Sequence, residues 1–351
     1  MLKEIRLAKK IFITNLGFSA PYQLNFSITY NCNSRCKFCN IWKIKSREEL
    51  RLEEIEKIAK NARFIQWLRL TGGEPFLRRD YVDILKAFYE NSEGLYLVST
   101  PTNAIAYELS YMSIKKVLEF FDRKYIISIS LDGDEETHDK LRGIKGNWKR
   151  AIKLYKMLFD LKSKHKNFNV VFGYTIYPAN VGMFERAYYA IKSELGEIVT
   201  INDFNFNLFE ISEVYYHNIG IEKKKEYMKA AAEEIKKILR MRKNSLSSID
   251  IIQEKYLKLA IKYLKEGRTP IRCNILNLSC FLDPYGNVYP CTIFGEKLGN
   301  LRENSYDLKK ILNSERAKYI KNKTIRLECP NCWTPCEAHQ LIVSNFARIL
   351  E

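Results

Sequence analysis

Residues 23–39 read QLNFSITYNCNSRCKFC, a short strand pattern followed at once by cysteines at positions 32, 36 and 39. Alternate residues of the strand part are apolar, and strand side chains alternate between two faces. Three thiolates in one loop select a soft or borderline metal, which is zinc or iron–sulfur. No fourth cysteine lies near them in the sequence. We therefore expect a metal site with one open position, which a substrate or cofactor fills.

Short apolar runs and amphipathic helical patterns alternate from this loop onward. We expect strands at 23–29, 66–72, 95–100, 125–132, 169–177 and 203–210, and helices at 47–62, 81–90, 147–162 and 183–195. This alternation favours a parallel sheet that curves into a barrel. Residues 221–267 then predict two lysine-rich helices joined at 244–248, and a cysteine-rich region with a turn at 283–287 follows.

Four of the expected strands have one apolar and one polar face. The polar residues are Asn25, Ser27, Thr29, Trp67, Arg69, Thr71, Ser128, Ser130, Asp132, Asp203, Asn205 and Asn207. Parallel strands bury their apolar face beneath the covering helices, so the polar residues must face the interior, which a closed barrel fills with Val, Ile and Leu. We therefore expect a cavity for a polar ligand. An antiparallel sheet with one solvated face is the alternative.

The composition is that of a globular protein with a basic surface. The 351 residues carry 58 basic and 41 acidic side chains, a net charge of +17. The lysines are spread along helices, as in heat-adapted proteins, and the charge leaves nucleic acid and anionic lipid open as partners. We expect no membrane span and no signal peptide, hence a cytoplasmic protein with reduced thiols. Nine cysteines grouped at two ends favour two metal sites.

The cysteine loop resembles the CxxxCxxC loop of radical S-adenosylmethionine (SAM) enzymes, with an aromatic residue before the last cysteine. TGGEP (71–75) resembles the family's GGEP motif, SISLDG (128–133) ends the fourth expected strand, and HDKLRGIKGNW (138–148) resembles the segment that supplies an arginine. The resemblance implies an α/β fold with a partial (β/α)6 TIM-like barrel. It also implies a [4Fe–4S] cluster on Cys32, Cys36 and Cys39, whose open iron binds SAM.

The same resemblance implies the residues that contact SAM. They are Phe38, Gly72, Gly73, Glu74, Pro75, Asn103, Ser128, Ser130, Asp132 and Arg142. Glu74 and the backbone carbonyls freed by the Gly-Gly turn would accept from the methionine ammonium, and Arg142 would pair with the carboxylate of SAM. Weaker candidates to face the substrate from the fifth and sixth strands are Tyr174, Tyr177, Asp203 and Glu210, for which a structural role is the alternative.

Six further cysteines lie in the last third of the chain and resemble the SPASM/twitch extension of the family. They are Cys273, Cys280, Cys291, Cys329, Cys332 and Cys336. A full extension uses seven cysteines for two auxiliary clusters, and six cannot supply four thiolates twice. We therefore expect at least one auxiliary [4Fe–4S] cluster; a second would have to be incomplete or held by a non-cysteine ligand, and a structural zinc site is the alternative. Thr292 stands where sulfatase maturases have an acidic base, which weakens the analogy to that reaction.

These patterns predict a radical SAM barrel over 1–220, a helical connector over 221–267 and a SPASM/twitch domain over 268–351. The implied function is reductive cleavage of SAM to a 5′-deoxyadenosyl radical, which abstracts hydrogen from a peptide or protein. A ferredoxin- or flavodoxin-type protein would donate the electron. We expect no fused leader-binding domain, because only 31 residues precede Cys32. Two alternatives stay open: a radical SAM enzyme acting on a lipid, tetrapyrrole, nucleoside or RNA, and a zinc-stapled basic nucleic-acid-binding protein.

Overall fold

Six parallel strands form most of the sheet in the computed structural model, which describes residues 21–243, 245 and 247–345. The strands are β1 (Gln23–Thr29), β2 (Trp67–Gly72), β3 (Leu97–Thr102), β4 (Lys124–Ser130), β5 (Phe168–Ile176) and β6 (Phe204–Leu208). Each strand pairs in parallel with the next one along the chain. The parallel partial barrel expected from the sequence is confirmed, and the antiparallel alternative is wrong.

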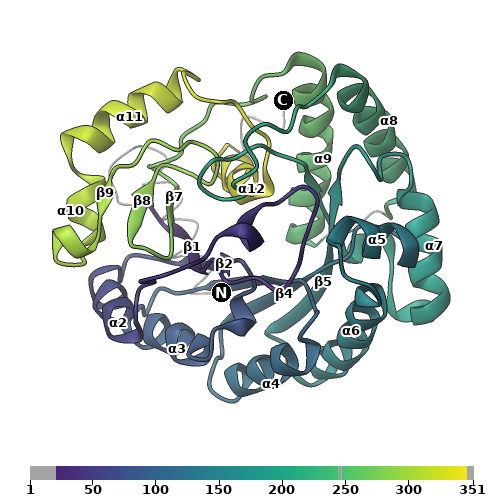
Figure 1. Cartoon of the computed structure of the whole chain (residues 1–351), viewed down its shortest axis with the longest axis horizontal. Helices are drawn as coiled ribbons and strands as arrows, with labels where there is room; N and C mark the ends of the chain where they lie inside the picture. The colour runs from purple at the N-terminus through teal and green to yellow at the C-terminus, as the bar shows by residue number, and fades with distance from the viewer. Residues whose placement is uncertain (1–20, 244, 246, 346–351) are drawn as a thin grey trace.

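Helices cover the outer face of these strands (Figure 1). They are α2 (Leu52–Asn61), α3 (Tyr81–Asn91), α4 (Tyr107–Leu118), α5 (Glu135–Arg142), α6 (Asn147–Lys164) and α7 (Phe184–Leu195), with short 3-10 helices η1 (Ile41–Lys43), η2 (Pro75–Leu77), η3 (Gly196–Ile198) and η4 (Ile201–Asp203). Ile127, Ile129 and Leu131 are fully buried in the core, so the apolar face of β4 points toward the helices as predicted. No helix in the described part of the chain is long and apolar enough to span a membrane.

The cysteine-rich region continues the same sheet. β7 (Ser279–Leu282) pairs in parallel with β1, and β8 (Asn287–Tyr289) and β9 (Gly299–Asn300) follow in antiparallel. β1 therefore has strands on both sides, which leaves it no open edge. The remaining elements are α8 (Lys225–Met241), α9 (Ser248–Glu266), η5 (Arg302–Asn304), α10 (Leu308–Leu312), α11 (Glu315–Ile325) and α12 (Pro335–Ser344). α12 lies near the centre of the molecule, beside α9 (Figure 1).

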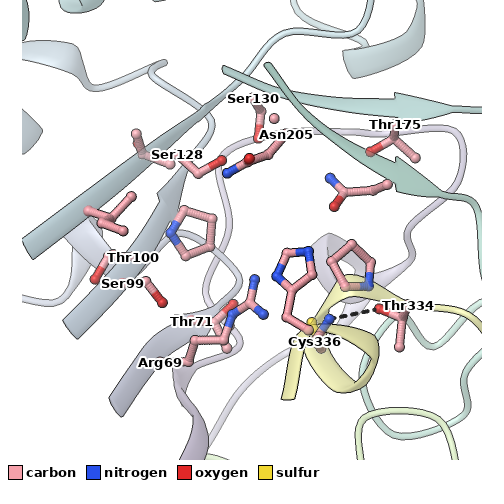
Figure 2. A pocket seen from close by; sticks show the side chains of 18 of the residues that line it. Arg69, Thr71, Ser99, Thr100, Ser128, Ser130, Thr175, Asn205, Thr334 and Cys336 are labelled. Carbon is pink, nitrogen blue, oxygen red and sulfur yellow. Dashed lines mark hydrogen bonds between the residues drawn. The ribbon is translucent and has the colours of Figure 1, made fainter. Parts of the chain in front are cut away.

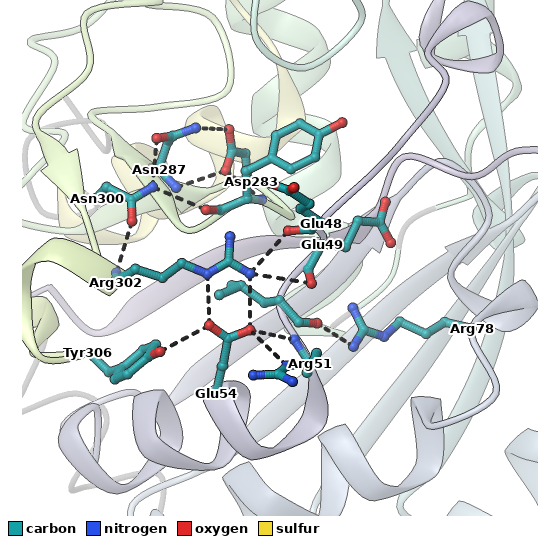
Figure 3. A network of polar contacts seen from close by, with 12 residues as sticks. Glu48, Glu49, Arg51, Glu54, Arg78, Asp283, Asn287, Asn300, Arg302 and Tyr306 are labelled. Carbon is teal, nitrogen blue, oxygen red and sulfur yellow. Dashed lines mark hydrogen bonds and ion pairs between the residues drawn. The ribbon is translucent and has the colours of Figure 1, made fainter.

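A buried carboxylate ties this region to the barrel helices. Glu54 on α2 accepts from Arg302 Nε at 2.7 Å, from the Tyr306 hydroxyl at 3.0 Å and from the Arg51 backbone N–H at 2.9 Å (Figure 3). These donors favour the charged carboxylate and lower the pKa of Glu54 to about 2. The bond to Arg51 also explains why α2 begins at Leu52 rather than at 47, because Glu54 caps the first turn.

Candidate active site and auxiliary cysteine site

A cavity of about 430 Å³ fills the interior of the partial barrel. Its walls carry the polar faces of five strands: Arg69, Thr71, Ser99, Thr100, Ser128, Ser130, Thr175, Asn205 and Asn207. Cys336 and His339 of α12, and Thr334 directly before it, also border the cavity. Figure 2 shows Thr334 and Cys336 among the lining residues. The polar interior predicted for β2, β4 and β6 is confirmed.

The first strand departs from that expectation. Asn25 and Ser27 are buried but do not line the cavity. The Asn25 side chain accepts from Gln23 at 2.9 Å and donates to Glu337 on α12 at 3.5 Å. Asn25 of β1 therefore bonds to α12 instead of facing the cavity.

The three cysteines of the loop all border the cavity at the carboxyl ends of the strands. Arg142 donates toward Cys36 Sγ at 3.6 Å, and the Ser34 hydroxyl lies 3.1 Å from the same sulfur. Asn103 Nδ2 donates toward Cys32 Sγ at 3.8 Å. Burial raises the pKa of Cys32 to about 12, so this thiol ionises only with added positive charge such as that of a metal centre.

This donor set fits a cluster with three protein ligands, since the thiols face open space on one side and positive charge on another. In the described residues no three side chains of His, Cys, Asp or Glu converge on the position of a single metal ion. A four-iron cluster binds each thiolate at a different iron and therefore spreads its ligands more widely. The loop is held by its backbone: the N–H groups of Arg35 and Lys37 donate to the carbonyls of Arg142 and Leu141 at 3.0 and 2.9 Å.

The GGEP motif lies against the end of β1. A Cβ on Gly72, whose φ is +134°, would lie 2.1 Å from the Thr29 carbonyl oxygen, and a Cβ on Gly73 would lie 2.2 Å from that of Asn31. Only glycine permits this close approach to the cysteine loop. Both glycines border the cavity, whereas Pro75 starts η2 and does not.

Glu74 also borders the cavity and is almost fully buried. Its carboxylate accepts from the Asn103 backbone N–H at 2.7 Å and from that of Phe76 at 3.4 Å. Burial, the largest influence, raises the pKa of Glu74 to about 7. Asn103 therefore links the GGEP motif to Cys32, which agrees with its predicted place in the site.

Asp132 corrects the sequence analysis, which expected it to contact SAM. It is fully buried and does not line the cavity. Its carboxylate accepts from Arg142 Nε at 2.6 Å and from the Thr175 N–H at 2.8 Å. The alternation of β4 ends at Ser130, so the face of Asp132 is set by the turn into α5 and not by the strand. Asp132 orients Arg142, whose guanidinium lies 5.1 Å from the centre of the Phe38 ring.

The weaker substrate candidates all lie outside the cavity, which is a second correction. Tyr174 packs against Phe184 on the helix side of β5, one residue out of phase with Thr175. Tyr177 packs on Phe38. Asp203 caps η4 by accepting from Thr200, and Glu210 is buried, where it accepts from Lys223, Tyr263 and the Trp333 N–H.

The six C-terminal cysteines separate into three places. A second cavity of about 20 Å³ is bordered by Cys273, Cys291, Cys329 and Cys332. Burial is the largest influence on the Cys273 thiol and, with a smaller contribution from the nearby Cys329, raises its pKa to about 12. Four thiols around one small space fit a cluster with four cysteine ligands. Cys280 is fully buried on β7 beside Leu24, and Cys336 borders the barrel cavity. The structure does not bring these two to the second cavity.

Several cavity residues were not predicted to lie in the barrel site. Arg69 was expected on the polar face of its strand but was given no role. Cys336 was predicted as an auxiliary metal ligand and His339 was given no role, because nothing in the sequence shows that α12 reaches the barrel cavity. Tyr215 follows β6 and its hydroxyl lies 2.6 Å from that of Thr71.

A partial parallel barrel with a three-thiol loop beside a polar cavity, and a separate four-thiol site, defines an iron–sulfur protein that binds a small polar cofactor. The model of the radical SAM superfamily matches residues 26–188, and that of the SPASM iron-sulfur cluster-binding domain matches residues 273–333. The chain belongs to the radical SAM superfamily and is an enzyme of its SPASM group. Its cofactors are a [4Fe–4S] cluster and SAM, and the SPASM domain implies auxiliary iron–sulfur clusters in addition.

Curated relatives include a protein of peptide biosynthesis and a group of cyclases. The antilisterial bacteriocin subtilosin biosynthesis protein AlbA of Bacillus subtilis is 25% identical over 311 residues, 86% of this chain and 62% of AlbA. A probable GTP 3′,8-cyclase of Thermoplasma volcanium is 33% identical over 136 residues, 38% of this chain and 40% of the relative. The chain therefore spans less than two thirds of either relative.

Solved structures share the fold at low identity. The structure of anSMEcpe with bound AdoMet and Kp18Cys peptide has a TM-score of 0.61 at 15% identity, covering 94% of this chain and 98% of that one. Streptococcus suis SuiB bound to precursor peptide SuiA has a TM-score of 0.58 at 18% identity, covering 91% and 71%. At these identities the likeness shows the fold alone.

Proposed function

We propose that this enzyme abstracts hydrogen from a peptide or protein, with its SAM-binding cluster on Cys32, Cys36 and Cys39. The observation that carries the proposal is that the three thiols open directly into a polar cavity large enough for a cofactor and part of a substrate. When bound there and given one electron by an external donor, the cluster and SAM would supply a 5′-deoxyadenosyl radical and release methionine. The walls of the barrel around this cavity would shield such a radical from side reactions.

The chain's own residues would hold SAM by complementary charge. Arg142 stands beside Cys36 and would pair with the SAM carboxylate, while Asp132 fixes the guanidinium in place. Glu74 and the backbone near Gly72 would accept from the SAM ammonium. Ionised Glu74 is disfavoured by burial, so the bound ammonium would also favour its charged form.

For the second site we propose one auxiliary [4Fe–4S] cluster on Cys273, Cys291, Cys329 and Cys332. Four cysteine ligands leave no open iron, so this site would transfer electrons and not bind substrate. Glu210 accepts from the N–H of Trp333, next to Cys332, and thereby fixes this loop to the end of β6. An external ferredoxin- or flavodoxin-type donor would supply the electron.

A peptide substrate is favoured by the extent of the similarity. The alignment with AlbA covers 86% of the chain, whereas that with the cyclase of Thermoplasma volcanium covers 38%. SuiB, which shares the fold, is bound to a precursor peptide. A nucleoside triphosphate is the second candidate, because the cyclase is the more identical relative within its shorter match.

The proposal is tested by tracing the abstracted hydrogen with deuterium-labelled substrates. The reconstituted enzyme is reduced with dithionite and SAM under anaerobic conditions, together with perdeuterated peptides or with deuterated GTP. We expect 5′-deoxyadenosine to gain deuterium, detected as a mass shift, from the peptides only. Deuterium from GTP would establish the second candidate, and reduced enzyme that forms no 5′-deoxyadenosine at all would contradict the proposal.

A further inference from the structure

Arg69 is a guanidinium that borders the cavity and has no role in the chemistry proposed above. It lies on β2 between Trp67 and Thr71, on the face opposite the fully buried Leu68 and Leu70. Figure 2 shows Arg69 and Thr71 entering the cavity from the same strand, with Cys336 of α12 nearby. Since a strand advances about 3.3 Å per residue, Arg69 stands about 7 Å below Thr71, the residue that begins TGGEP. It is therefore deeper in the barrel than the SAM-binding motif.

The guanidinium of Arg69 has no hydrogen-bond or ion-pair partner in the part of the chain that the structure describes. Glu337 is the carboxylate that influences it electrostatically. That carboxylate is already bonded, by the Ser279 hydroxyl at 2.9 Å and the Thr292 N–H at 3.1 Å. A guanidinium removed from bulk water without a partner costs free energy unless a ligand supplies the counter-charge.

The neighbours of Arg69 in the cavity are neutral. Burial and the charge of Arg69 lower the pKa of His339 to about 3, so this imidazole is uncharged near neutral pH. Ser99, Thr71 and Cys336 complete the surroundings. No carboxylate other than Glu74 borders the cavity in the described residues, and Glu74 lies at the GGEP motif, so the lower cavity carries an excess of positive charge.

The second guanidinium of the cavity provides the contrast. Arg142 has its own carboxylate, since it donates to Asp132 at 2.6 Å. Glu74 is the carboxylate that borders the cavity in the described residues, and it is bound at the GGEP motif by the N–H of Asn103. Neither carboxylate compensates Arg69.

We propose that Arg69 binds a carboxylate of the substrate, either an Asp or Glu side chain or a C-terminus. This rests on the peptide substrate of the proposed function and names the group that the cavity selects. A guanidinium presents two parallel N–H donors that match one carboxylate. A triphosphate requires several cations. Besides Arg69 and the paired Arg142, the cation that borders the described cavity is Lys124, at the opposite end of the strands from the cysteine loop.

The experiment measures charge preference in binding, without reductant, so that it is independent of radical chemistry. Two acetylated and amidated peptides, Ala-Ala-Glu-Ala-Ala and Ala-Ala-Gln-Ala-Ala, are titrated into the cluster-reconstituted enzyme with SAM, and GTP is titrated separately. We expect the Glu peptide to bind at least about tenfold more tightly than the Gln peptide, as a charge-assisted pair predicts. Arg69→Gln should remove this difference, and Arg69→Lys should retain part of it.

Lys124→Gln is the matched control, because it removes a cavity cation of the same charge and should leave the preference unchanged. Arg69→Met serves if Arg69→Gln does not fold, and iron content is measured for every variant. Equal affinities of the two peptides, including no detectable binding of either, would overturn the proposal. So would an unchanged preference in Arg69→Gln, or GTP binding more tightly than the Glu peptide. Formation of 5′-deoxyadenosine, measured separately, reports on the proposed function alone.

Discussion

The two cysteine sites of this enzyme differ in the number of thiols and in the space beside them. The three thiols of the cysteine loop, with Cys336 of α12 as a separate neighbour, border a cavity of about 430 Å³, whereas four thiols surround one of about 20 Å³. In our proposal the missing ligand and the large space belong together, because an iron without a cysteine has room for SAM. The four-thiol site has neither an open ligand position nor room for a substrate. The number of cysteines and the adjoining volume therefore separate a reactive site from an electron-transfer site.

The largest effect is expected at the three-thiol loop. Cys36→Ala should abolish formation of 5′-deoxyadenosine and lower the iron content from about eight to about four per chain. The matched control is Cys280→Ala, which removes a buried thiol that borders neither cavity. It should retain about eight irons and full cleavage. Residual cleavage in Cys36→Ala would place the reactive cluster elsewhere.

The four-thiol site should respond differently. Cys332→Ala should also lower iron to about four per chain, but SAM cleavage by the reduced enzyme should persist, since the reactive cluster is intact. Cys336→Ala, four residues away, should keep about eight irons because this thiol faces the barrel cavity. Iron loss in Cys336→Ala would break the distinction between the two sites.

Within the reactive site, substitutions of Asp132 and Ser130 should have different effects. Asp132 orients Arg142, whereas Ser130 borders the cavity directly. Asp132→Ala leaves Arg142 buried without its partner, so we expect a loss of about 3–5 kcal/mol in the free energy of unfolding and weaker SAM binding. Ser130→Ala removes one hydroxyl and should cost about 0.5–1.5 kcal/mol. Urea denaturation and SAM titration measure both. Similar stability of the two variants would show that the Asp132–Arg142 pair contributes little.

The smallest effect concerns the contact between the two regions. The folded pKa of Glu54 is about 2, below the ordinary value of 4.5. A lowered pKa stabilises the fold above pH 4.5, and this contribution is lost as the pH falls toward 2. Because the Arg302 side chain is 34% exposed, solvent screens the pair, and we expect it to contribute about 0.5–1 kcal/mol to the free energy of unfolding. Glu54→Gln should remove this part of the acid sensitivity in unfolding curves. If the stability of Glu54→Gln fell between pH 4.5 and 2 as much as that of the unmodified enzyme, this role of Glu54 would be contradicted.

The sequence predicted the strands and the orientation of β4 because alternation of apolar and polar residues reports directly which face is buried. Ser128 and Ser130 line the cavity and Ile129 is in the core, as expected. Asp132 shows where this reasoning ends, since the strand stops at Ser130 and a turn has no alternation. Spacing alone also could not divide six cysteines. Which of them meet depends on how α12 packs against the barrel, and no local pattern encodes that contact.

The most direct test of the account is electron paramagnetic resonance of the reduced, reconstituted enzyme with and without SAM. The account predicts two [4Fe–4S] signals, of which one shifts when SAM is added. The triple variant Cys32→Ala, Cys36→Ala and Cys39→Ala should lack the shifting signal and keep the other. A signal in this variant that still responds to SAM would contradict the assignment of the open site to the three-thiol loop.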